Sequence, residues 1–112
     1  EQHGLYVILD LHLPAGGLQP SVGQGARLWD NRSNQERTIN LWAELARRYV
    51  NNTTVAAYDL LNEPTPTQNS SQYYSFIQEV VDAIRIEERY SKASFGDSSV
   101  FSPIEGMFFA YA

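Results

Sequence analysis

An asparagine and a glutamate, Asn62 and Glu63, stand directly after an apolar stretch and before Pro64. A carboxyl group at a strand end, in semi-apolar surroundings, can keep its proton near neutral pH and act as a general acid. A neighbouring carboxamide can hold a substrate hydroxyl. Acid-assisted cleavage of a glycosidic bond requires groups of these two kinds. The alternative interpretation of Glu63 is an ordinary solvated carboxylate at a turn.

Asp10 and His12 stand two residues apart at the end of an earlier apolar stretch. Because side chains alternate along a strand, this spacing places both on one face. We predict that Asp10 is a buried polar group satisfied by its neighbours. His12 is either a structural hydrogen-bonding residue or part of a site. With Glu63 these residues could also serve a metal-dependent hydrolase, but no second histidine stands at ligand spacing, so no metal site is predicted.

Trp29 lies beside Leu28 and Asp30 in a polar, glycine-rich segment. A pyranose ring has an apolar C–H face, and an exposed indole in this segment could stack on it. The alternative is that the indole folds the segment back onto the rest of the molecule. The sequence leaves both interpretations open.

Two short apolar segments must position these groups. Residues 6–12 are β-rich, lack a helical period and end at a Pro-Ala-Gly-Gly turn, which predicts a strand buried on both faces. Residues 55–61 form a second such strand and run into Asn62. Glycines and polar residues fill positions 13–35, so we expect a long loop there.

An amphipathic helix separates the two strands. Ser33 and Glu36 have the spacing of a capping box at its start. Its apolar face, at helical spacing, consists of Ile39, Trp42, Leu45, Ala46 and Tyr49. After a polar loop at 65–70, a second helix carries an apolar stripe of Tyr73, Phe76, Ile77, Val80, Val81 and Ile84. The order strand, helix, strand, helix predicts a βαβα unit with parallel strands.

The composition excludes several classes of protein. The chain of 112 residues has a net charge of −5, and its basic residues form no patch, so nucleic-acid binding is not expected. There is no cysteine, which rules out disulfides and thiolate chemistry. No apolar run approaches the roughly 20 residues of a membrane helix. A small globular α/β domain fits these values.

Three segments together resemble glycoside hydrolase family 5, among its cellulase-like members: residues 5–12 (LYVILDLH), 41–49 (LWAELARRY) and 58–64 (YDLLNEP). The resemblance covers roughly residues 4–85. It implies a (β/α)8 TIM barrel that hydrolyses a β-linked polysaccharide with retention, without a metal or organic cofactor. The chain would be a fragment of that barrel, about strands 3–6 with helices 3 and 4.

The resemblance also implies roles for single residues. Glu63 matches the general acid/base of the family, and Asn62 matches the asparagine that binds the sugar hydroxyl next to the reacting carbon. His12 matches the histidine that lines the same subsite. Trp29 is a candidate sugar platform in the loop after His12. The second carboxylate of the retaining mechanism has no counterpart among the later glutamates, which are Glu79, Glu87, Glu88 and Glu105.

The tail departs from the family pattern. Residues 85–92 are charged where the family has an apolar strand, and residues 100–101 and 107–111 are the candidate strand pieces. A barrel of this type needs about 250 residues. We therefore expect residues 1–112 to be a partial catalytic domain, truncated at both ends, with two open sheet edges and no activity by itself.

The alternative function is a non-catalytic carbohydrate-binding remnant that keeps Trp29, His12 and Asn62 as a sugar-contacting surface. In either case the expected partner is a β-linked polysaccharide or oligosaccharide, with no nucleic acid and no membrane. Such polymers lie outside the cell, so an extracellular location is expected. The sequence identifies neither the glycan nor the oligomeric state.

Overall fold

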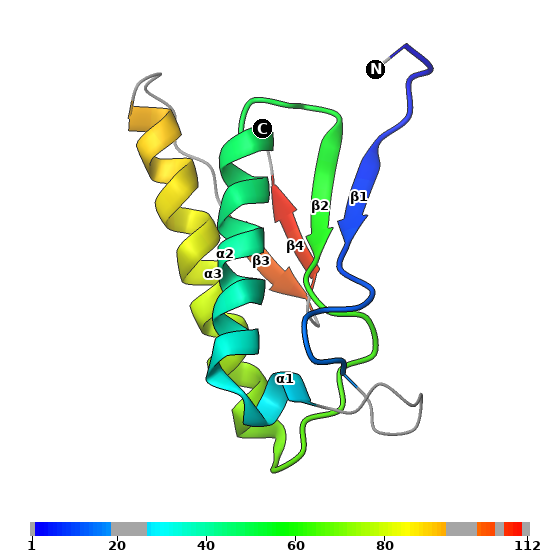
Figure 1. Ribbon diagram of the computed structural model, residues 1–112. Coiled ribbons are helices and arrows are strands. Elements are labelled where there is room, and N and C mark those ends of the chain that lie inside the picture. Colours follow the sequence, from blue (N-terminus) through cyan, green and yellow to red (C-terminus); the bar gives the residue numbers. More distant parts are fainter. Residues whose placement is uncertain (1, 19–26, 94–100, 105–106, 111–112) are drawn as a thin grey trace.

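The computed structural model describes residues 2–18, 27–93, 101–104 and 107–110, with side chains described up to residue 89. A four-stranded sheet carries two long helices that pack side by side (Figure 1). In chain order the elements are β1 (Val7–Asp10), α1 (Arg27–Asp30), α2 (Arg32–Tyr49), β2 (Val55–Asp59), α3 (Ser70–Ala93), β3 (Phe101–Ile104) and β4 (Met107–Ala110).

Strands β1 and β2 pair in parallel, with Asp10 opposite Asp59 at their ends. The segment between them includes α2, as a parallel crossover requires. The predicted parallel βαβα order is therefore confirmed. Both strands end two residues earlier than predicted, at Asp10 and at Asp59.

The start of α2 differs from the prediction. Asn31, not Ser33, is the N-cap, and its side-chain oxygen accepts a hydrogen bond from the backbone N–H of Asn34. Carboxamide and hydroxyl caps are nearly equivalent, so spacing alone did not select between them. The predicted loop over 13–35 is also wrong in its second half, because α1 and the first turn of α2 lie within it.

The core lies between the helices and the sheet. The indole of Trp42 on α2 is fully buried, packs at 5.3 Å between ring centroids against Tyr58 of β2, and donates to the carbonyl oxygen of Leu60 at 3.2 Å. Burial, followed by the negative charge of Glu88, raises the pKa of Tyr58 to about 12. From α3 the buried apolar residues are Phe76, Ile77, Val80, Val81 and Ile84, five of the six residues of the predicted stripe, and the sixth, Tyr73, is partly buried.

The C-terminal part of the chain does not continue the parallel order. Helix α3 extends to Ala93, through the charged residues 85–92 that fitted a strand poorly. Strand β4 pairs antiparallel with both β2 and β3, and the sheet order is β1-β2-β4-β3. Only two residues separate β3 from β4, too few for a parallel crossover. The expectation that the tail supplies further parallel barrel strands is wrong for this structure.

The edges of the sheet also differ from expectation. We predicted an open edge on each of two parallel strands, but β4 covers that of β2. Strand β1 lies at one edge of the described sheet, and the consecutive side chains of Leu5, Tyr6, Val7 and Ile8 are exposed. The interpretation of residues 6–12 as a strand buried on both faces is thus wrong in this chain. Among the described residues, no helix has the length and apolar character to cross a membrane.

Candidate active site

Backbone hydrogen bonds hold together the segments that follow β1 and β2. The N–H of Leu11 donates to the carbonyl of Asp59 at 3.0 Å, and the N–H of Asn62 donates to the carbonyl of Leu11 at 3.4 Å. The parallel register therefore persists for a few residues beyond the strands. It places His12 and Asn62, which are 50 positions apart in the sequence, at the same end of the sheet.

Asp10, His12 and Asn62 form a hydrogen-bonded series. The imidazole Nδ1 of His12 lies 3.0 Å from Oδ2 of Asp10, and its Nε2 lies 3.4 Å from Nδ2 of Asn62. The structure thus brings His12 next to Asn62, as the site prediction requires. Asp10 is exposed and contacts His12, so its predicted role as a buried polar group is wrong.

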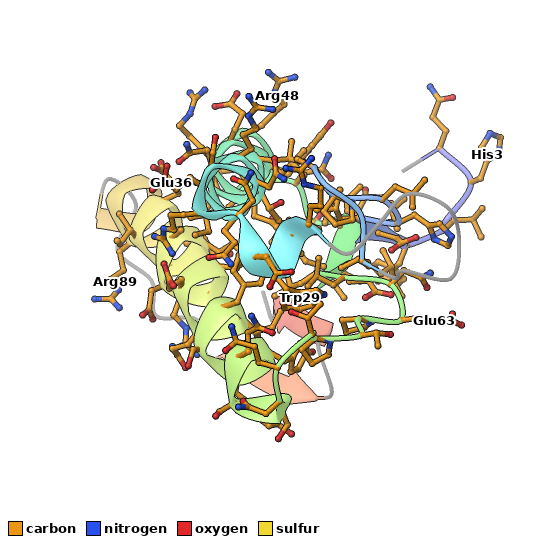
Figure 2. All side chains as sticks on the ribbon, turned by 60° about the horizontal axis from the view of Figure 1, so that its bottom comes forward. His3, Trp29, Glu36, Arg48, Glu63 and Arg89 are labelled. Carbon is orange, nitrogen blue, oxygen red and sulfur yellow. The ribbon has the colours of Figure 1, made fainter. Side chains whose placement is uncertain are left out.

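Glu63 follows Asn62 on the exposed loop after β2. Figure 2 views the end of the molecule where β1 and β2 finish, and it shows Glu63 at the outer side of this loop. Its backbone has a φ of 46°, in the left-handed region, which costs a non-glycine residue roughly 1–2 kcal/mol. Among the described residues it is the one non-glycine residue with positive φ. Strain of this kind concentrates at functional sites.

The loop that carries Glu63 is anchored to the helical layer. After Pro64 the chain passes α1, where the hydroxyl of Thr67 donates to a carboxylate oxygen of Asp30 at 2.8 Å. The side chain of Gln72, at the start of α3, donates to the carbonyl oxygen of Trp29 at 3.0 Å. These contacts hold the part of the loop that leads into α3, so the position of Glu63 depends on α1 as well as on β2.

Asp59 is an acidic residue next to Asp10 and His12 whose position the sequence did not predict. It is partly buried at the end of β2, opposite Asp10. Burial raises the pKa of the Asp59 carboxyl, the negative charge of Asp10 raises it further, and His12 opposes the shift. The available signal was the occurrence of Asp at the end of both predicted strands, which parallel pairing makes neighbours.

The Asp59 carboxyl should make stability depend on pH. A carboxyl with a raised pKa binds more protons in the folded than in the unfolded chain. The free energy of unfolding therefore falls as pH rises from the ordinary pKa of 3.8 through the raised pKa of the folded protein. We expect Asp59→Asn to stabilise the protein relative to wild type at pH 7 but not at pH 3. Urea unfolding at both pH values measures the difference, and Asp82→Asn on the surface of α3 is the control. A wild type more stable than Asp59→Asn at pH 7 would contradict this.

Trp29 lies inside the molecule. Its side chain is 3% exposed, its indole N–H donates to the carbonyl of Leu18 at 3.2 Å, and its ring contacts Tyr73 and Phe76 of α3. Figure 2 shows it near the centre of this end of the molecule, well away from Glu63. The prediction of an exposed sugar platform at Trp29 is wrong, and the alternative of an indole that packs the loop onto the core holds.

A substitution distinguishes packing from sugar binding at Trp29. Trp29→Phe removes the donor to the buried carbonyl of Leu18, and we expect it to lower the free energy of unfolding by about 1–3 kcal/mol. Any affinity for a sugar ligand should match that of wild type, because the indole offers no exposed face. Urea unfolding and isothermal titration calorimetry measure the two effects. A large loss of affinity with unchanged stability would reverse this assignment.

Two other features do not belong to the site. A groove of about 490 Å³ lies between α2 and α3 and is lined by residues such as Arg32, Ile39, Glu79 and Ile86, none of which contacts His12 or Asn62. Within the described part of the chain, no three His, Cys, Asp or Glu side chains gather as a metal site would require. The trio of Asp10, His12 and Glu63 is therefore not assembled as a metal centre.

Comparison with known proteins identifies the family. The profile described as cellulase (glycosyl hydrolase family 5) matches residues 1–89, which include both parallel strands and most of α3. The chain belongs to glycosyl hydrolase family 5. This family has the (β/α)8 barrel fold, of which the parallel β1–α2–β2 unit is a part. The antiparallel strands β3 and β4 lie beyond the matched residues.

Curated relatives carry names of glycan-cleaving enzymes. The chain is 35% identical over 106 residues to a β-xylosidase of Phanerodontia chrysosporium, covering 90% of this chain and 22% of that protein. It is 39% identical to cellodextrinase A of Ruminococcus flavefaciens over 57% of this chain and 19% of that one. It is 29% identical to endoglucanase C of Acetivibrio thermocellus, over 94% of this chain and 30% of that protein.

A solved structure shows a similar fold. The crystal structure of an endogalactoceramidase superimposes with a TM-score of 0.62 at 23% identity, and the match covers 80% of this chain and 31% of that one. This likeness supports the fold of the chain. The chain spans between 19% and 30% of the length of the three curated relatives.

Proposed function

We propose that this family 5 chain is part of an enzyme that hydrolyses O-glycosidic bonds in a β-linked glucan with retention of configuration. The observation that carries the proposal is the position of Asn62 and Glu63 at the carboxyl end of a parallel strand, with His12 of the neighbouring strand at hydrogen-bond distance from Asn62. In barrels of this kind, catalytic residues come from the carboxyl ends of strands. The names of the endoglucanase and cellodextrinase relatives support a β-glucan as substrate.

Each residue has a defined part in the proposed reaction. Glu63 donates a proton to the leaving glycosidic oxygen and then removes a proton from the attacking water. Asn62 and His12 hold the reacting sugar. The nucleophilic carboxylate, which a retaining enzyme needs about 5–5.5 Å from the acid, is supplied by a part of the enzyme outside these 112 residues. By itself this chain is then inactive.

The exposed edge of β1 supports the proposal that more barrel surrounds this chain. Leu5, Tyr6, Val7 and Ile8 expose apolar side chains at that edge, and a neighbouring strand would cover them. In the complete barrel, β1 and β2 would be strands 3 and 4, with α2 and α3 as helices 3 and 4. Residues 1–112 are then one part of a larger catalytic domain that acts outside the cell, where its polymeric substrate lies.

The test is hydrolysis by the full-length protein that contains this chain. Soluble mixed-linkage β-glucan and cello-oligosaccharides serve as substrates, and xylo-oligosaccharides test the activity that the β-xylosidase relative is named for. Release of reducing ends, with the β-anomer detected first by NMR, is the expected result. Binding of β-glucan without release of reducing ends would replace the proposal with the carbohydrate-binding alternative. The burial of Trp29 removes the stacking surface on which that alternative mainly depended.

A further inference from the structure

The two hydrogen bonds of His12 specify a single form of its imidazole. The carboxamide nitrogen of Asn62 only donates, so Nε2 of His12, 3.4 Å away, must accept. The proton of the neutral ring is then on Nδ1, where Oδ2 of Asp10 accepts it at 3.0 Å. Both contacts require the same tautomer. A carboxylate cannot donate, so Asp10 favours the Nδ1–H form whatever occupies the other side of the ring.

The tautomer also determines which end of Asn62 faces a ligand. With Nε2 as acceptor, the nitrogen of the carboxamide turns towards His12 and its oxygen turns away. With the proton on Nε2 instead, the carboxamide would have to rotate, bring its oxygen to His12 and present its nitrogen to the ligand. The Nδ1–H tautomer would therefore select a ligand hydroxyl that donates to Asn62, and the Nε2–H tautomer would select a ligand group that accepts from it.

We infer that Asp10 is a positioning residue that acts through His12 to keep the carboxamide oxygen of Asn62 directed at the substrate as a hydrogen-bond acceptor. This inference deepens the proposed function and rests on it, because the substrate group is the sugar hydroxyl next to the reacting carbon. Asp10 itself does not touch the sugar. Its part in specificity is to require a hydroxyl that donates at this position.

The first measurement is the tautomer of His12 in the full-length protein, from the ¹⁵N chemical shifts of its labelled imidazole. Wild type should carry the proton on Nδ1. Asp10→Ala removes the acceptor that holds the proton on Nδ1 and should move the proton to Nε2. Asp82→Asn removes a carboxylate that accepts from Gln78 on α3, far from His12, and should change nothing.

The second measurement is ligand affinity, made in a Glu63→Gln background to prevent turnover. The ligands are cellotriose and its analogue with fluorine in place of the C2 hydroxyl of the reacting ring, since fluorine accepts but does not donate. Cellotriose should bind about fivefold more tightly than the analogue, the value of one hydrogen bond. Asp10→Ala should remove most of this preference.

Two results would overturn the inference: a proton on Nε2 of His12 in wild type, or an Nδ1–H tautomer that persists in Asp10→Ala. Should Asp10→Ala fail to fold, the wild-type spectrum still decides, because a proton on Nε2 overturns the inference and a proton on Nδ1 supports it. Failure of the proposed function gives a different pattern, in which the tautomers respond as expected but the protein neither binds cellotriose nor releases reducing ends from β-glucan.

Discussion

Replacing Glu63 with Gln is expected to slow hydrolysis of cello-oligosaccharides by the full-length protein at least about 100-fold. An alkoxide is a poor leaving group, so breaking the bond needs a proton, and an amide cannot supply one. An aryl glycoside with a strongly acidic phenol needs little protonation, because the phenolate leaves by itself. Cleavage of the aryl glycosidic bond, which is the first step of the reaction, should therefore be far less affected by Glu63→Gln.

Steady-state and pre-steady-state rates with the two substrate types measure this difference. Glu36→Gln is the matched control, since Glu36 is an exposed glutamate on α2 whose carboxylate pairs with Arg32. It should leave both rates unchanged. Equal losses in the pre-steady-state rate of the first step on the oligosaccharide and on the activated aryl glycoside would remove Glu63 from the role of acid and leave it a structural or binding residue.

Replacing Trp42 with Ala should lower the free energy of unfolding by about 3–5 kcal/mol. The indole is fully buried, contacts the ring of Tyr58 and donates to the carbonyl of Leu60. Alanine would leave a cavity between α2 and the sheet, and the Leu60 carbonyl would lose its partner. Because Leu60 lies two residues before Asn62, we also expect the site loop to lose order.

Urea unfolding followed by circular dichroism measures the change in stability. Leu41→Ala removes a neighbouring apolar side chain on α2 that is 41% exposed, and it should cost far less. Trp42→Phe keeps an aromatic ring but removes the donor, so it separates the cavity from the hydrogen bond. A loss for Trp42→Ala no larger than that for Leu41→Ala would contradict the placement of Trp42 at the centre of the core.

The sequence was informative where a local pattern has one physical meaning. Apolar residues at helical spacing placed α2 and the buried stripe of α3, since a helix buries one face whatever it packs against. Two short apolar segments separated by a helix predicted the parallel pair β1 and β2. The three segments typical of family 5 led to Asn62, Glu63 and His12, and the match over residues 1–89 confirms the family.

Other features depended on contacts between residues far apart in the chain. The burial of Trp29 depends on Leu18, Tyr73 and Phe76, and no local pattern separates such an indole from an exposed one. The antiparallel pairing of β4 with β2 likewise depends on which strand edge the last residues reach.

The sequence by itself thus determined the family, the parallel strand–helix–strand unit and the chemical groups at its carboxyl end. Only the tertiary structure placed His12 against Asn62 and Asp59 opposite Asp10. The reason is physical: helical and strand patterns reflect which side of an element meets water, whereas a hydrogen bond between two strands depends on their register. Register is set by the packing of the whole sheet.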